Sequence, residues 1–248
     1  RFGEILGDLE HVRGGVLHGW TYLIDERADG EADGRVLVED LRFEGLNGIQ
    51  APGGRAYTLR RCQIETLGPG IVVGDMARVA DCDILGVSGT RAGAGIKTGD
   101  FSRIKECRVE NGEDGIWGGS HSVVRNSLVN APSGRGIHAS EIYRSRAIDC
   151  GDDALSAPFI FGTRIVESTG ITQSGRAISS GDVVRSFGAT EDSLSPAIFA
   201  GGTVFASTGD ASGGEGIDAN LVDLSSGSSD GRSGILAKIV ARSEGISP

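Results

Sequence analysis

One short motif, a Gly or Ala followed by an aliphatic residue, recurs along this chain about every 21 residues. A repeat of this length indicates a stack of similar structural units, because one such repeat is too short to bury its own apolar face. The aliphatic members of the motif are Ile49, Ile71, Ile96, Ile116, Ile137, Leu155, Ile178, Ile198, Ile217 and Ile235.

A second apolar pattern follows the first at a nearly constant phase. It is clear at Val38, Leu59, Val79, Ile104 and Val124, and it is traceable through Ile142, Ile160, Val183, Val204, Leu221 and Ile239. Both patterns are short and bounded by Gly, Asn, Asp and Ser, which is typical of strands, whereas helical repeats need longer amphipathic stretches. We therefore expect an all-β solenoid, a parallel β-helix of about ten or eleven coils over residues 36–248.

Residues 1–35 do not follow the repeat. Their apolar residues Phe2, Ile5, Leu6, Leu9 and Val12 are at helical spacing and predict a short N-terminal capping helix. Such a helix, followed by the acidic loop 25–34, would cover the strand edge of the first coil. No similar cap is expected at the other end, and the coil ends therefore offer a route to an oligomer.

Composition narrows the classes of partner. The net charge of -10 argues against nucleic acid, although local groups of Arg and Lys could still bind a polyanion. No apolar run approaches the roughly 18 residues of a membrane span. The four cysteines form no CxxC pair, so a zinc or redox site is not expected. Cys62, Cys82 and Cys107 hold one position in successive coils and predict free thiols in the core, beside Leu41 and Ser127.

The candidate site follows from the alternation of side chains in a strand. Residues on either side of an inward aliphatic residue point outward. In five successive coils these outward positions bring together carboxylates, cations, an imidazole and an indole, at Lys97, Asp114, Trp117, Arg135, His138, Asp152, Asp153 and Arg176. We expect them to form one functional face.

Asp114 and Asp153 are the expected acid–base pair, with Asp152 and His138 as further catalytic residues. Asp114 and Asp153 lie two coils apart, so their Cα atoms would be separated by roughly 9.6 Å. This is close to the carboxyl separation of about 6.5–9.5 Å in inverting glycosidases. Arg135, Arg176 and Lys97 would bind acidic groups of the substrate, and Trp117 would carry a sugar ring. A lyase would instead take its base from Lys97, His138 or Arg135.

A structural interpretation explains the same residues. Asp114, Arg135, Asp153 and Arg176 alternate in sign along one column, and opposite charges on neighbouring strands stabilise a sheet by roughly 0.2–1 kcal/mol per pair. The two adjacent carboxylates, Asp152 and Asp153, could also hold calcium. Few other ligands are evident there, so no cofactor or metal is expected.

The stretches "NGEDGI" (111–116) and "GDDAL" (151–155) resemble motifs of the polygalacturonase family, within the pectin-lyase-like right-handed β-helix superfamily. The resemblance implies right-handed coiling and catalytic roles for Asp114, Asp152 and Asp153. The sequence departs from the family in three ways. The two motifs lie two coils apart, the G-H-G stretch is replaced by "SGRAIS", and "RIK" (103–105) precedes the acidic motifs.

The expected function is an enzyme that acts on a polysaccharide or oligosaccharide, as a glycoside hydrolase, lyase or epimerase. The alternative is a non-catalytic glycan-binding, tailspike-like or structural β-helix protein, because a fold alone does not imply a function. For either function, we expect the protein to be secreted or at the cell surface.

Overall fold

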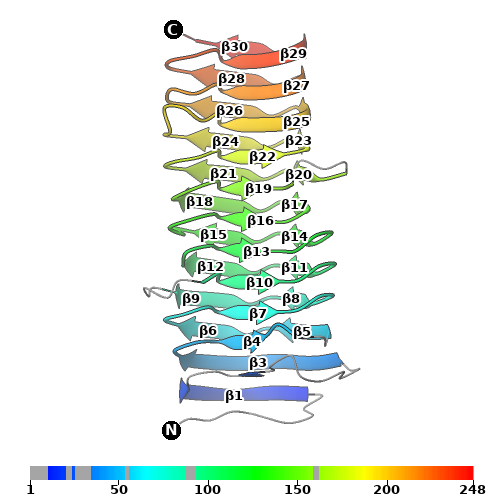
Figure 1. The fold of residues 1–248 in the computed structure, drawn as a ribbon, viewed down its shortest axis with the longest axis vertical. Helices are drawn as coiled ribbons and strands as arrows, with labels where there is room; N and C mark the ends of the chain where they lie inside the picture. Colours follow the sequence, from blue (N-terminus) through cyan, green and yellow to red (C-terminus); the bar gives the residue numbers. More distant parts are fainter. Residues whose placement is uncertain are drawn as a thin grey trace. The chain divides into compact units, whose positions relative to one another are not determined.

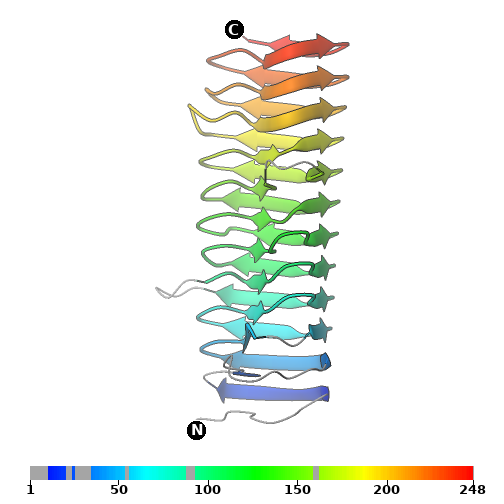
Figure 2. The same ribbon diagram turned by 45° about the vertical axis from the view of Figure 1, so that its right-hand side comes forward.

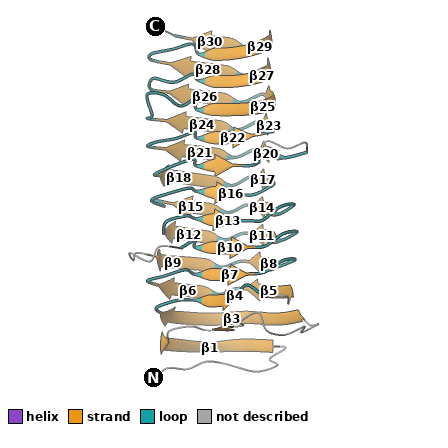
Figure 3. Ribbon diagram, in the orientation of Figure 1, coloured by secondary structure: helices purple, strands orange, loops and turns teal. Residues whose placement is uncertain are grey.

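A computed structural model describes residues 11–20, 24–25, 35–53, 56–87, 93–158 and 162–247. The chain divides into two compact units, Arg1–Val129 and Asn130–Pro248, and each is described by itself. All regular elements in these ranges are β-strands (Figure 3). The described part of the chain contains no apolar helix of membrane-spanning length.

The first unit is a stack of coils, each built from up to three short strands joined by turns (Figure 1). Every pairing is parallel, and each strand pairs with its counterpart in the next coil. The strands are β1 (His11–Trp20), β2 (Ile24–Asp25), β3 (Arg35–Gly45), β4 (Ile49–Ala51), β5 (Ala56–Arg60), β6 (Gln63–Thr66), β7 (Ile71–Val73), β8 (Arg78–Ala80), β9 (Asp83–Val87), β10 (Ile96–Thr98), β11 (Arg103–Lys105), β12 (Arg108–Asn111), β13 (Ile116–Trp117), β14 (Val123–Arg125) and, at the boundary, β15 (Leu128–Asn130).

The second unit repeats this organisation, and the turned view shows its strands lying one above another in successive coils (Figure 2). Its strands are β16 (Ile137–His138), β17 (Glu141–Tyr143), β18 (Arg146–Cys150), β19 (Leu155–Ser156), β20 (Arg164–Val166), β21 (Thr169–Thr172), β22 (Ile178–Ser180), β23 (Asp182–Val184), β24 (Phe187–Thr190), β25 (Ile198–Phe205), β26 (Thr208–Ala211), β27 (Ile217–Asp223), β28 (Ser226–Ser229), β29 (Ile235–Ala241) and β30 (Glu244–Ile246).

The first aliphatic column is confirmed within each unit, and so is the parallel β-helix. Ile49, Ile71, Ile96 and Ile116 pair in register in the first unit and are buried. In the second unit the register joins Ile137, Leu155, Ile178, Ile198, Ile217 and Ile235. Ile235 is only half-buried, because no described coil follows its own.

The second column is confirmed from Val38 to Val124, and its continuation needs correction. Ile160 lies outside the described residues, and Ile165 is the residue that pairs with Ile142 and Val183. Leu221 and Ile239 were assigned inward and are wrong by one residue. Their neighbours Val222 and Val240 continue the column, and Val222 is fully buried. A shift of one residue moves a side chain to the other face of a strand.

The predicted capping helix lies mostly outside the described residues. Its last two residues, His11 and Val12, belong to β1, which pairs in parallel with β3. Strand pairing therefore extends N-terminal of residue 36, where the sequence analysis began the β-helix. The right-handed coiling and the role of residues 1–10 stay predictions.

Glycine is needed directly in front of Ile49 and Ile96 because neighbouring coils approach closely there. A Cβ atom at Gly48 would lie 2.0 Å from the carbonyl oxygen of Gly70 in the next coil, and one at Gly95 would lie 2.2 Å from a methyl group of Val109. Neither site has room for a side chain. This packing explains part of the high glycine content of the sequence.

Each coil turns into its third strand at one residue in the left-handed region, which is uncommon for residues other than glycine. In both units these corner residues have φ between 47° and 56°. They are Asp40, Arg61, Asp81, Glu106 and Asn126 in the first unit and Arg144, Glu167, Arg185, Ala206, Leu224 and Arg242 in the second.

In the second unit the residue after each corner is a serine, and these serines form a hydrogen-bonded ladder. The Oγ atom of Ser168 accepts the N–H of Ser145 at 3.2 Å and donates to the carbonyl of Val166 at 2.8 Å. The same pair of bonds recurs from coil to coil, so each corner is tied to the next one. The serine ladder comprises Ser145, Ser168, Ser186, Ser207, Ser225 and Ser243.

In the first unit the same place is held by the predicted cysteine column. Cys62, Cys82 and Cys107 are buried free thiols, and each donates to the carbonyl two residues before it, at 3.5, 3.2 and 3.3 Å. A hydrogen bond with Cys82, together with burial, raises the pKa of the Cys62 thiol. The prediction of free core thiols is therefore confirmed.

Candidate functional site

Three strands of the first unit present the first group of predicted site residues. In β7, β10 and β13 the inward aliphatic residue is followed directly by Val72, Lys97 and Trp117, which pair in register. Backbone bonds fix this register, since the N–H of Gly95 donates to the carbonyl of Asp114 at 2.9 Å. The alternation within a strand makes these side chains neighbours on the outer face.

These strands and the turns before them enclose a pocket of about 410 Å³, here called the Trp117 pocket. It contains Lys97, Asp114 and Trp117, three of the eight residues of the predicted functional face. Lys97 is exposed, while Asp114 and Trp117 are half-buried. The remaining lining residues are Pro69, Val72, Gly93, Ala94 and Glu113.

Glu113 is the polar lining residue that the site prediction left out. It lies beside Asp114 in the "NGEDGI" stretch and is exposed. Two carboxylates and one ammonium group therefore line the pocket, next to the indole of Trp117. Such a set offers hydrogen-bond acceptors, donors and a flat apolar surface to one ligand.

The second group of predicted residues lies in the second unit, around the turn before β19. Asp153 is half-buried, and its Oδ1 accepts the backbone N–H of Arg176 at 2.8 Å. Burial raises the pKa of Asp153, and the neighbouring charge of Asp152 acts in the same direction. Arg135 Nε lies 3.6 Å from Asp152 Oδ2.

These contacts show what the charged column does within the second unit. Asp153 binds the backbone of the next coil, Asp152 forms an ion pair with Arg135, and the guanidinium of Arg176 lies 4.4 Å from the ring centre of Phe199. The charges of Arg176 and Arg135 act on Asp153 as the charge-ladder interpretation requires, but the ion pair of Arg135 is with Asp152, which lies outside that column. The raised pKa of Asp153 is the property that a general acid requires.

His138 lies at the outward position of β16. Its Nδ1 is 3.4 Å from Ser156 Oγ, in the strand that pairs with it. The two polar groups are therefore neighbours on the outer face of the second unit.

Asp114 belongs to the first unit and Asp153 to the second, so their pairing as acid and base stays a prediction. The same applies to a single face that would join Lys97 and Trp117 to His138 and Arg176. What the structure brings together is Lys97, Asp114 and Trp117 in one group, and Arg135, Asp152, Asp153 and Arg176 in another.

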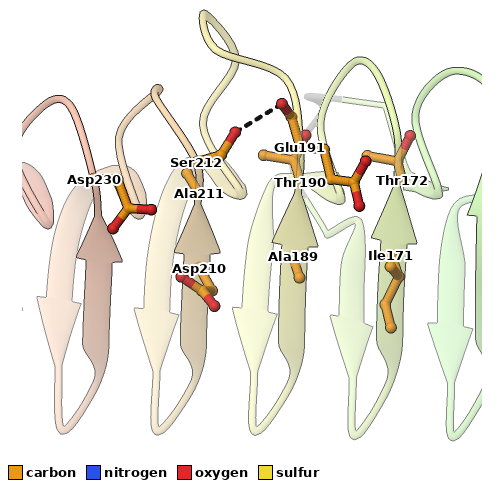
Figure 4. A pocket seen from close by; sticks show the side chains of 9 residues that line it. All are labelled: Ile171, Thr172, Ala189, Thr190, Glu191, Asp210, Ala211, Ser212 and Asp230. Carbon is orange, nitrogen blue, oxygen red and sulfur yellow. Dashed lines mark hydrogen bonds between the residues drawn. The ribbon is translucent and has the colours of Figure 1, made fainter.

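The second unit contains a hollow of about 260 Å³ that sequence reasoning missed (Figure 4). It follows strands β21, β24 and β26, and Asp210, Glu191 and Asp230 give it an acidic lining. Ser212 Oγ donates to the backbone carbonyl of Glu191 at 2.7 Å across it. No group of three or more His, Cys, Asp or Glu residues suited to a metal is found among the described residues.

Another hollow, of about 380 Å³, lies on the outer face of the neighbouring strands β25, β27 and β29. Phe199 and Leu236 form its apolar wall, and Asp218 and Lys238 contribute charge. Burial raises the pKa of Asp218, and the nearby Glu215 adds to this effect. Phe199 and Asp218 continue the outward column of His138 beyond the predicted functional face, whose last residue is Arg176.

No protein-family model, curated protein or solved structure matches this chain significantly. The resemblance to polygalacturonases stays a prediction, based on the two acidic stretches alone.

Proposed function

We propose that the protein binds a polysaccharide or oligosaccharide and that the Trp117 pocket receives one of its sugar rings. The observation that carries this proposal is the grouping of Trp117, Lys97 and Asp114 around one pocket of about 410 Å³. Ligand pockets range over about 300–1,000 Å³ and combine apolar surface with a few polar groups. The carboxylates accept hydrogen bonds from sugar hydroxyls, and Lys97 donates to ring or hydroxyl oxygens.

Binding is tested with a panel of neutral and uronic-acid polysaccharides, using affinity electrophoresis and tryptophan fluorescence. The chain has two tryptophans, so fluorescence is measured in a Trp20→Phe background that reports on Trp117 alone. A bound glycan should protect Trp117 from a soluble quencher. Trp117→Ala should abolish binding of the neutral polysaccharides, while Phe205→Ala, an aromatic control on an exposed site of the second unit, should not. Unchanged binding by Trp117→Ala would contradict the pocket assignment.

A second candidate function is cleavage of the polysaccharide, with Asp153 as general acid. The observation in its favour is the raised pKa of Asp153, because a general acid must hold a proton before it donates it. Cleavage is measured through new reducing ends and through the absorbance of unsaturated products. Asp153→Asn should lower turnover by about 10²–10⁴-fold, and Asp83→Asn, an exposed control, should leave it unchanged. Equal turnover of the two variants would remove Asp153 from the mechanism.

A further inference from the structure

The outer face of one sheet in the first unit is basic, although the whole chain has a net charge of -10. This face is formed by β5, β8, β11 and β14, which pair in parallel register, and β3 pairs with β5 at its edge. The outward positions of β5, β8, β11 and β14 hold five cations and no carboxylate among the described residues, while the position in β3 that pairs with Arg60 holds Glu39. These cations, here called the basic stripe, are Arg60, Arg78, Arg103, Lys105 and Arg125.

Two members of the stripe are neighbours of like charge. Arg78 and Arg103 pair in register, and both are exposed. Within the described ranges, neither has a carboxylate at ion-pair distance. Like charges placed directly opposite in a sheet are destabilising, so this pair does not stabilise the fold of the protein when no ligand is bound. The arrangement is favourable when an anionic group binds between the two guanidinium groups.

Other members of the stripe are already paired with acids. Arg60 Nε lies 2.7 Å from Glu39 Oε2, and Lys105 Nζ lies 2.8 Å from Glu106 Oε1. The unsatisfied positive charge is therefore concentrated at Arg78 and Arg103. The corresponding strands of the second unit, β17, β20 and β23, carry Glu141, Arg164 and Asp182 instead and form no such stripe.

The shape of the stripe indicates the kind of partner. It crosses four strands, so its length is roughly 14 Å at the usual strand spacing. Carboxylates border it on both sides, with Asp75 and Asp100 in the turns before the strands and Asp81 and Glu106 in the corners after them. A flat anionic membrane would cover these acids too and be repelled, whereas a single linear polyanion fits between them.

We propose that the basic stripe binds an acidic polysaccharide, with its carboxylate or sulfate groups held by Arg78 and Arg103. Single-stranded nucleic acid is the less favoured polyanion, because its binding sites interleave aromatic rings with the cations. The four strands of the stripe carry no outward aromatic side chain. The nearby Phe101 lies in the preceding turn and stacks on His121, with ring centres 4.8 Å apart.

This surface is separate from the Trp117 pocket, so the inference does not depend on the function proposed for that pocket. The experiment measures Kd for polygalacturonate and chondroitin sulfate, with dextran as neutral polymer and oligothymidylate as nucleic acid. Binding of the acidic polymers should weaken when ionic strength rises from about 0.01 M to about 0.15 M, because the Debye length falls from about 30 Å to about 8 Å. Dextran should not bind the stripe.

The decisive variant is Arg78→Gln combined with Arg103→Gln, which should raise Kd for the acidic polysaccharides roughly tenfold or more. The control, Arg42→Gln combined with Arg108→Gln, removes the same charge from exposed sites outside the stripe and should change Kd little. Arg78→Lys combined with Arg103→Lys keeps the charge and should retain most of the binding. This result would show that the Gln variant binds weakly because it has lost the charges and not because it is misfolded.

Arg78→Gln combined with Arg103→Gln should leave the protection of Trp117 by a neutral glycan unchanged, so failure of the pocket and failure of the stripe are distinguishable. Three results would overturn the proposal. They are equal weakening by the stripe variant and its control, tighter binding of oligothymidylate than of either acidic polysaccharide, and no binding of an acidic polymer at low salt.

Discussion

Replacing Ser186 by alanine tests whether the serine ladder stabilises the second unit. Ser186 Oγ accepts the N–H of Ser168 at 3.2 Å and donates to the carbonyl of Val184 at 2.9 Å, and the residue is 5% exposed. Alanine removes both bonds and leaves a buried N–H group without its partner. An unsatisfied buried donor costs about 1–3 kcal/mol, and we expect the free energy of unfolding to fall by that amount.

Cysteine at the same position gives a graded comparison, because the first unit already uses cysteine there. A thiol is a weak donor and a weak acceptor, yet Cys82 Sγ still lies 3.2 Å from the carbonyl of Ala80. Ser186→Cys should therefore lose less stability than Ser186→Ala. Urea denaturation gives the midpoint and the slope for each protein, and stability follows from their product.

The matched control is Ser193→Ala, which removes a hydroxyl group from an exposed turn of the same unit. We expect its unfolding midpoint to equal that of the unmodified protein. The reasoning is refuted if Ser186→Ala and Ser193→Ala unfold at the same urea concentration. It is also refuted if Ser186→Cys proves less stable than Ser186→Ala.

Two further predictions concern the core and the charged column. Ile116→Ala should cost about 2–5 kcal/mol of unfolding free energy through lost burial and a cavity, and Asp114→Asn under about 1 kcal/mol; the reverse order in denaturant melts would contradict the assignment of inside and outside. Since burial raises the pKa of Asp153, its ionisation costs stability in the native state, and the cost grows as pH rises from the ordinary value of 3.8 through the native pKa. Asp153→Asn removes this cost, so its stability relative to the unmodified protein should increase over that window and then level off, as measured by denaturant melts at several pH values. A relative stability that stays constant or falls as pH rises would show that the pKa of Asp153 is not raised.

The sequence predicts the fold well where apolar and polar residues alternate clearly. Ile96 stands between Gly95 and Lys97, so only one residue of the three suits the core, and the register follows. The prediction fails at Leu221–Val222 and Ile239–Val240, where two adjacent residues are both apolar and composition does not show which one points inward. There the register comes from pairing with the preceding coil, which periodicity alone does not reveal.

The candidate site was predictable in part for the same reason. Lys97 and Trp117 follow inward isoleucines directly, so alternation places them on the outer face. The acidic hollow of the second unit was missed because its carboxylates occupy different positions within their coils. Asp210 lies in β26, whereas Glu191 and Asp230 lie in the turns that follow β24 and β28. Ser212 occupies the position of Glu191 and Asp230 in the coil between them, so the sequence shows no continuous column of carboxylates.

The serine ladder also has a consequence for how the gene for such a protein can change. Each interior serine presents the same acceptor to the coil before it and the same N–H donor to the coil after it. An in-frame duplication of residues 186–206 would therefore add one coil whose corner serine hydrogen-bonds with the serines of both neighbouring coils. Deletion of those residues would join Arg185 to Ser207 and leave a continuous serine ladder with one serine fewer. Unequal recombination between repeats changes the number of coils in one step, without the series of compensating substitutions that a globular core would require.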